Sequence, residues 1–131
     1  MEQKYIINDI VLYNNKIMVI KEPIDGIHFD LYCPKEGLIY CFVDVSEIKP
    51  VRLTIAILEK NGWNKRTKVC YDGEHLESFN NPSFPLEHFA IVFTEKGIRV
   101  TYDCLPVREI KYVSDLQHLL FGLNINHEME V

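Results

Sequence analysis

The sequence lacks the features that mark several large classes of protein. No stretch approaches the ~18 consecutive apolar residues of a transmembrane helix, and the N-terminal MEQKYIINDI has no apolar signal-peptide core. These absences predict a cytoplasmic protein with no membrane partner. Basic residues are also a minority, with 14 Lys and Arg against 19 Asp and Glu and a net charge of −5. Proteins that bind phosphate backbones are usually basic, so we expect no duplex nucleic acid as a partner.

Motifs for cofactors, metals and covalent catalysis are missing as well. The chain has no G-x-G-x-x-G, no P-loop and no G-x-S-x-G sequence. Its four cysteines, at positions 33, 41, 70 and 104, show no C-x-x-C spacing. A zinc site needs four convergent ligands, and the predicted register places Cys33 and Cys41 on opposite faces of a strand pair. We expect no metal, no cofactor and no disulfide between these two, and interpret the cysteines as buried thiols.

The chain does contain the pattern of a small β-rich fold. Its 131 residues, 47% of them hydrophobic and 25% charged, suit one domain or two small modules sharing a core. Residues 1–52 predict a meander of five short strands. Asn14-Asn15 suits a type I′ hairpin turn, and Pro34–Gly37 suits a four-residue turn. Pairing across the second turn predicts one apolar face made of Phe29, Leu31, Cys33, Leu38, Tyr40 and Phe42. We interpret 1–52 as an SH3-like small barrel.

Residues 53–131 predict an antiparallel sheet with two short helices. Thr54 is a helix N-cap candidate and Asn61-Gly62 a stop, which predicts a helix over 54–61. A hairpin is predicted around Glu95-Lys96, because apolar residues alternate on both sides of that pair. Residues 72–87 predict a long loop. The chain as a whole is therefore predicted to be α+β and rich in strands, an N-terminal barrel followed by a sheet.

The C-terminal segment predicts a capped helix over 114–122. Ser114 and Gln117 have capping-box spacing, and Gly122 can adopt the left-handed conformation that ends a helix. Four leucines then form the stripe expected to face the core: Leu116, Leu119, Leu120 and Leu123. Alternating residues 125–131 predict a closing edge strand.

The best candidate binding site is a group of basic and aromatic residues after the first predicted helix. Such residues suit a ligand with phosphates and a stackable base, through charge-assisted hydrogen bonds and ring stacking. An alternative is purely structural, because charges beyond a helix C-terminus favour its dipole and a tryptophan there often anchors the core. The predicted ligand-binding residues are Trp63, Lys65, Arg66, Lys68 and Tyr71. The loop 72–87 is a second candidate, as a cover for a pocket or a partner.

A catalytic interpretation is weaker. His118 is a candidate general base for a thiol such as Cys104 or Cys70, but no signature of a cysteine nucleophile surrounds either residue. Since no carboxylate pair stands out among the acids either, we expect a protein without catalytic residues.

Three stretches resemble a widespread family of small uncharacterised proteins from phages and prophages of Bacteroidetes-type bacteria. They are NDIVLYNNKIMVI at 8–20, LTIAILEKNGW at 53–63 and IKYVSDLQHLL at 110–120. This chain has Ser114 where many relatives have histidine, so no role of that histidine transfers. The resemblance implies a phage or mobile-element setting within a bacterial host. It implies no activity, ligand or catalytic residue.

Three functions follow as hypotheses. The first is a non-catalytic, homo-oligomeric anti-defence protein that sequesters a small nucleotide signal. It depends on the phage-like resemblance and on the basic and aromatic residues. The second is an SH3-like protein-interaction module that binds a host or phage protein, and the third is a small hydrolase that uses Cys70 or Cys104 with His118.

Overall fold

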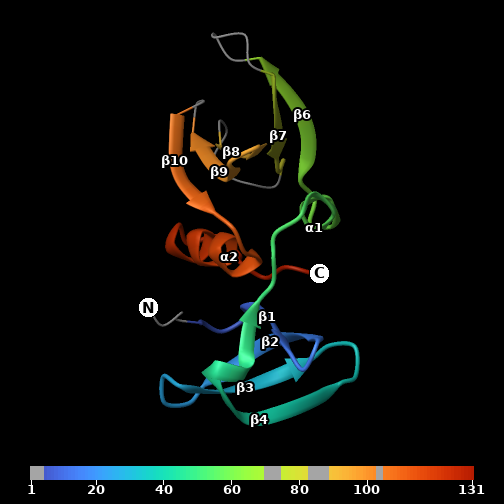
Figure 1. Cartoon of the computed structure of the whole chain (residues 1–131), viewed down its shortest axis with the longest axis vertical. Helices are drawn as coiled ribbons and strands as arrows, with labels where there is room; N and C mark the ends of the chain where they lie inside the picture. The colour runs from blue at the N-terminus through green and yellow to red at the C-terminus, as the bar shows by residue number, and fades with distance from the viewer. Residues whose placement is uncertain (1–4, 70–74, 83–88, 103–104) are drawn as a thin grey trace. The chain divides into compact units, whose positions relative to one another are not determined.

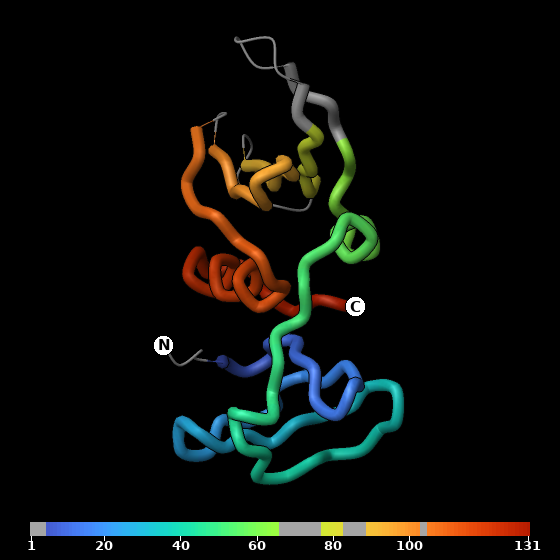
Figure 2. The backbone as a smooth tube through the Cα atoms, in the orientation of Figure 1, coloured from blue at the N-terminus to red at the C-terminus, as the bar shows by residue number. Residues whose placement is uncertain are grey.

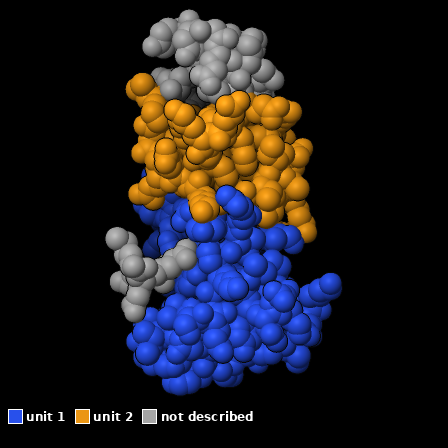
Figure 3. All heavy atoms as spheres, viewed as in Figure 1, with its two compact units in different colours: residues 1–52, 112–129, 131 blue, residues 53–111, 130 orange. Residues whose placement is uncertain are grey.

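The computed structural model describes residues 5–69, 75–82, 89–102 and 105–131, with the backbone alone for 66–69 and 75–76. They form two antiparallel five-stranded sheets and two α-helices (Figure 1). The predicted β-rich α+β class is confirmed. The chain divides into two compact units, which Figure 3 colours separately. Unit 1 comprises 1–52, 112–129 and 131, and unit 2 comprises 53–111 and 130.

The sheet of unit 1 is the predicted meander. Its strand order is β4-β3-β2-β1-β5, and a 3₁₀ turn, η1 (Val45–Glu47), precedes the last strand. No pairing among the described residues joins the two edge strands, so closure into a barrel is unconfirmed. The strands are β1 (Ile10–Tyr13), β2 (Lys16–Pro23), β3 (His28–Cys33), β4 (Leu38–Asp44) and β5 (Ile48–Pro50).

The first hairpin is confirmed in its turn and its register. Asn14 and Asn15 both have positive φ angles, 56° and 61°, as a type I′ turn requires. Ile10 pairs with Val19 and Leu12 with Ile17, so these four residues share one face as predicted. The opposite face supplies the core of the sheet, which contains Val11, Met18, Ile20, Phe29, Leu31, Cys33, Val43 and Ile48.

Helix α2 (Val113–Gly122) belongs to unit 1 and differs from its prediction at both ends. It begins after Tyr112, whose N–H donates to Asp115 Oδ2 at 2.8 Å, so the predicted Ser114 cap is wrong. Ser114 is buried inside the helix. Gly122 does not take the left-handed conformation, which falls instead to Asn124 with φ of 59°. Residues 125–131 form no strand, so the predicted closing strand is wrong too.

Gln117, which the sequence predicted to cap the helix, instead bonds to backbone groups outside it. Its fully buried amide accepts a hydrogen bond from the N–H of Ile10 at 2.8 Å. It also donates to the carbonyls of Asn8 at 2.6 Å and His127 at 3.0 Å. One side chain thereby connects the entry to β1, the helix and the C-terminal tail. Two of these partners, Asn8 and Ile10, lie more than a hundred residues away in sequence, which is why local spacing suggested a cap instead.

Unit 2 contains the second sheet, with the order β10-β9-β8-β7-β6, and helix α1 (Ile55–Lys60). The helix begins and ends as predicted: Thr54 Oγ1 accepts from the N–H of Ile57 at 3.3 Å, and Gly62 has a φ of 88°. The hairpin around Glu95-Lys96 is confirmed, with Thr94 paired to Gly97. The strands are β6 (Asn64–Val69), β7 (His75–Asn80), β8 (Phe89–Thr94), β9 (Gly97–Tyr102) and β10 (Leu105–Ile110).

The predicted loop 72–87 is wrong in its middle part. Strand β7 lies within it and pairs with β6 on one side and β8 on the other. Phe79, in this strand, is fully buried. The polar sequence concealed the strand, because both neighbours lie in the sheet and supply its hydrogen bonds. The rest of the predicted loop, 72–74 and 83–87, lies outside the described residues.

The predicted boundary after residue 52 coincides with the division between the units, but the C-terminal segment groups differently. The structure assigns residues 112–129 to unit 1, not to the second module. The chain leaves unit 1 and returns to it through two antiparallel segments that lie side by side (Figure 2). The N–H of Leu53 donates to Lys111 O at 3.0 Å, and that of Val113 donates to Val51 O at 2.8 Å.

Candidate functional site

The edge strand β4 exposes an unusual amount of apolar surface. It is the outermost strand of the unit 1 sheet, and no described strand pairs with its outer side. Leu38, Ile39 and Phe42 are 53%, 48% and 58% exposed. Cys41, a free thiol, is also exposed. From Leu38 to Val43 the strand contains no charged residue and no proline.

The other three edges of the described sheets have the usual protection against pairing. Edge strands are commonly blunted by proline, by lysine, by bulges or by short length. Strand β5 spans three residues and ends in Pro50, and the sequence of β6 contains three basic residues. Strand β10 contains Pro106 and a register shift between Pro106 and Arg108. Among these edges, β4 is therefore the one that offers four consecutive residues, Leu38–Cys41, without charge, proline or bulge.

A β-bulge limits the regular part of β4 to Leu38–Cys41. Leu31 pairs with Tyr40 and Phe29 with Val43, so two residues, Cys41 and Phe42, lie opposite Asp30. Phe42 has a φ of 58°, which non-glycine residues seldom adopt. Its N–H donates to Asp30 Oδ1 at 2.9 Å. Sequence pairing predicted Phe42 in the buried face; the bulge instead places Val43 in the core and leaves Phe42 exposed.

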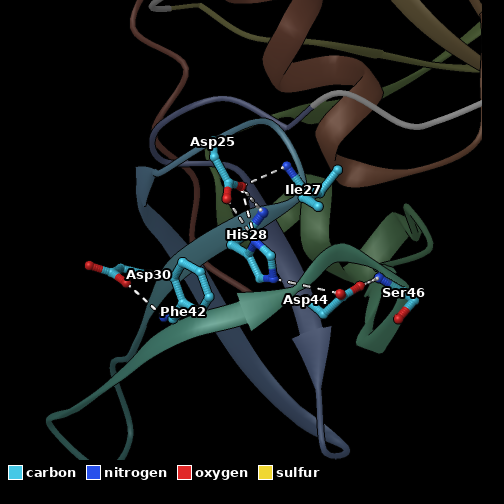
Figure 4. Close-up of polar contacts among 7 residues, drawn as sticks. All are labelled: Asp25, Ile27, His28, Asp30, Phe42, Asp44 and Ser46. Atoms are coloured by element: carbon cyan, nitrogen blue, oxygen red, sulfur yellow. Dashed lines mark hydrogen bonds and ion pairs between the residues drawn. The ribbon is translucent and has the colours of Figure 1, made fainter.

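An imidazole supports the exposed Phe42 ring (Figure 4). The rings of His28 and Phe42 stack with their centroids 3.9 Å apart and their planes at 6°. His28 lies between two carboxylates: Nδ1 is 2.9 Å from Asp25 Oδ2, and Nε2 is 3.7 Å from Asp44 Oδ2. We call Asp25, His28, Phe42 and Asp44 the bulge cluster. It joins an aromatic ring and two acids at the C-terminal end of β4.

The two acids of the bulge cluster are held in their charged form. The hydrogen bond from His28 lowers the pKa of Asp25, helped by the N–H groups of Ile27 and His28. The N–H of Ser46 lowers the pKa of Asp44. Both side chains are nearly half exposed. Since His28 contributes at most one positive charge to two carboxylates, the cluster is net negative whether His28 is protonated or neutral.

The opposite end of β4 does not have the acidic charge of the bulge. Glu36, in the turn before the strand, forms an ion pair with Lys16 at 3.0 Å and accepts a hydrogen bond from the Tyr40 hydroxyl at 2.9 Å. The Lys16 ammonium lowers the pKa of this carboxyl and keeps the pair charged. Lys35 is exposed beside it in the same turn. The edge therefore has an acidic end at the bulge, and at the turn an end where Lys16 and Lys35 outnumber Glu36.

The predicted basic and aromatic site is only partly within the described residues. Trp63 lies in unit 2 and is 4% exposed, and its N–H donates to Leu58 O at 3.0 Å. A ring so buried is a core anchor and offers no face to a ligand. Lys65 forms an exposed ion pair with Glu77 at 3.0 Å. The side chains of Arg66 and Lys68, and all of Tyr71, lie outside the described part of the structure.

The predicted general base has a different partner from the one expected. His118 Nε2 lies 2.5 Å from Oδ2 of Asp9, a residue with no exposed surface. Asp9 Oδ2 also accepts from the N–H of Ile6 at 2.9 Å. This pair attaches α2 to the segment before β1. Cys70 and Cys104, the proposed nucleophiles, lie outside the described residues. The described His, Cys, Asp and Glu residues include no group of three or more that could hold a metal.

Comparison with protein-family models, curated proteins and solved structures finds no match for the chain. The resemblance to phage proteins therefore stays a prediction. Among the described residues, no helix is both long and apolar enough to span a membrane. The site at β4 went unnoticed in the sequence, although one signal was present. That signal is the run Leu38–Val43, which contains neither charge nor proline.

Proposed function

We propose that this protein is a non-catalytic interaction module that binds an extended segment of another protein at β4. The observation that carries the proposal is the apolar edge of the unit 1 sheet at β4, where no strand of the described residues pairs with the outer side. In this mode of recognition, main-chain hydrogen bonds hold the added strand and side-chain contacts select its sequence. The regular segment Leu38–Cys41 provides the main-chain groups, and Leu38, Ile39 and Phe42 provide the contacts.

Order-of-magnitude free energies show how much main-chain hydrogen bonds and apolar side-chain contacts each contribute to binding. Pairing along four residues adds about four hydrogen bonds, each worth about 1 kcal/mol net. Covering the exposed halves of three large apolar side chains adds about 1 kcal/mol each. Association itself costs at least about 4 kcal/mol. Main-chain pairing alone thus leaves almost no net affinity, so the apolar side chains decide binding. These contributions leave about 3 kcal/mol, so contacts at these residues alone give a weak complex with a dissociation constant in the millimolar range.

The strand order supports the finer proposal that unit 1 is an SH3-like module. A five-strand meander whose last strand returns to pair with the first, after a 3₁₀ turn, agrees with that interpretation. The phage-like resemblance supplies a setting in which the partner is a host or phage protein. Sequestration of a nucleotide stays a hypothesis without added support, because the buried Trp63 provides no stacking surface.

Selection from a random peptide library tests the proposal, with an edge-blocking variant as the decisive comparison. Ile39→Lys places a charge on the exposed edge without disturbing the core, and Leu105→Lys makes the same change on exposed β10 of unit 2. We expect selected peptides to be extended and apolar. Ile39→Lys should weaken their binding roughly tenfold or more, since it replaces an apolar contact with a solvated charge. Leu105→Lys should leave it unchanged. Peptides insensitive to Ile39→Lys would refute the proposal.

A further inference from the structure

The two ends of β4 differ in charge, and this difference indicates which kind of segment can pair with the strand. We propose that the partner segment is apolar, preceded by a basic residue, and pairs antiparallel with β4 so that the basic side chain meets the bulge cluster. This inference rests on the proposed function and specifies its partner. Three observations carry it: the direction of the sheet, the unequal charge of the two strand ends, and the exposed aromatic ring.

Direction follows from the sheet itself. Every strand pair in unit 1 is antiparallel. Antiparallel pairing is also slightly more stable per residue than parallel pairing. In that arrangement the N-terminal end of the added segment lies beside the C-terminal end of β4. The residue that precedes the apolar part of the partner is therefore the one placed at the bulge.

The charge of the bulge cluster favours a basic side chain at this position of the partner. Asp25 and Asp44 leave a net negative charge at the bulge, while Lys16 balances Glu36 at the other end. A cation at the N-terminal end of the segment gains from two carboxylates, and a cation at its C-terminal end gains nothing comparable. We therefore expect the affinity to depend on where the basic residue lies in the partner segment, as well as on its presence.

The Phe42 ring adds a second attraction for a cation. One face of the ring stacks on His28, and the side chain is more than half exposed. A guanidinium or ammonium over an aromatic ring is attracted by the ring's electron density. His28 contacts both the ring and the carboxylates, so one basic side chain can reach both. Arginine suits this combination best, because its planar group stacks and also binds carboxylates through several donors.

A second copy of the chain fits the same edge less well. Strand β4 itself contains no basic residue, and in the turn before it Lys35 is followed directly by Glu36, so a paired copy brings a carboxylate to the bulge cluster together with any cation. In the two-fold pairing centred on Tyr40, Asp44 of one copy lies opposite Glu36 of the other. Like charges directly opposite each other destabilise a strand pair.

Two peptides of identical composition test the inference on the full chain. Both contain the extended core Val-Thr-Ile-Val-Thr with a fluorescent label; one has two arginines before the core and the other has them after it. We expect the first to bind roughly fivefold more tightly at low salt, which corresponds to an exposed ion pair of about 1 kcal/mol. The difference should shrink at high salt because exposed charges are screened.

A charge-removing variant assigns the preference to the bulge cluster. Asp25→Asn and Asp44→Asn together remove the charge, while each asparagine oxygen still accepts from the backbone N–H groups that hold the turn. We expect the two peptides to bind this variant equally. Glu95→Gln, an exposed change in the β8–β9 turn, is the matched control and should keep the preference. Dispersed amide NMR spectra confirm that each variant is folded.

The outcomes separate the two proposals. Equal binding of both peptides to the natural chain, with loss in Ile39→Lys, overturns this inference and leaves the proposed function standing. Tighter binding of the peptide with C-terminal arginines overturns the inference in the same way. No binding by either peptide, in a chain that dimerises through β4, overturns both.

Discussion

Some single side chains in unit 1 make structural contacts that their local sequence does not reveal. Gln117 is the clearest case, because its buried amide bonds to three backbone groups, two of them at the entry to β1 and one in the C-terminal tail. Local spacing indicates only that it follows Ser114 by three residues. The bulge at Phe42 is a second case, since it depends on how Asp30 and its neighbours pair and not on any turn residue.

Gln117→Leu tests the first of these roles. The substitution leaves one buried N–H and two carbonyls without their partner, and an unsatisfied buried group costs about 1–3 kcal/mol. We expect the free energy of unfolding to fall by about 3 kcal/mol in urea titration. Glu128→Gln, an exposed change in the same tail, should alter it by less than about 0.5 kcal/mol. Equal effects of the two changes would contradict the role assigned to Gln117.

The raised pKa of Tyr5 predicts that the free energy of unfolding falls at high pH. Burial, together with the nearby Asp9 charge, raises the pKa of Tyr5 to about 12. The unfolded chain releases this proton near pH 10, so the stabilisation is complete below pH 10 and is lost as the pH rises toward 12. At about pH 11 the loss amounts to about 1 kcal/mol relative to Tyr5→Phe, measured by urea unfolding at a series of pH values. Tyr32→Phe is the exposed control, and the same pH dependence in the two variants would contradict the prediction.

At the scale of elements, turn chemistry predicted the hairpins and the first helix well. These elements depend on local backbone requirements, namely positive φ angles at Asn14-Asn15 and Gly62 and a helix cap at Thr54. Such requirements can be predicted from neighbouring residues in the sequence. Strand β7, the start of α2 and the bulge in β4 depend on pairing partners remote in sequence. These are the places where expectation and structure differ. The candidate site at β4 depends on the same remote pairing, because exposure of an edge is a property of the sheet.

The first hairpin supports a stabilising prediction. Both turn residues have positive φ, and Asn-Gly is the preferred pair for this turn. Asn15→Gly should therefore raise the free energy of unfolding by about 0.5 kcal/mol. Asn15→Val, which cannot adopt positive φ without strain, should lower it by about 1 kcal/mol or more. Thermal unfolding measures both changes, and a destabilised glycine variant would count against the assigned turn.

At the scale of the whole molecule, unit 1 is built from two separate parts of the chain. Residues 1–52 supply the sheet, and residues 112–129 supply the helix that bonds to the entry of β1. Arg52 and Tyr112 lie opposite each other in an isolated β-bridge where the two parts meet. The unit therefore contains both parts of the chain, whereas the sequence predicted a division into 1–52 and 53–131.

Fragments test this dependence. Residues 1–52 alone should show no cooperative unfolding, because the N–H of Ile10 and the buried Asp9 lose their partners on α2. A chain in which a short Asn-Gly turn replaces 53–111 should unfold cooperatively, since residues 52 and 112 are already paired. Circular dichroism during urea titration distinguishes them. A cooperative transition in the 1–52 fragment would show that the sheet stands without the helix.

Amide hydrogen exchange tests the central claim most directly. It compares the natural chain with and without a saturating peptide whose two arginines precede the apolar core. Binding at β4 predicts slower exchange at amides within Leu38–Cys41 that point away from β3, with no change in β10. Unchanged exchange throughout Leu38–Cys41 while the peptide is bound would show that the edge of β4 is not where this protein takes its partner.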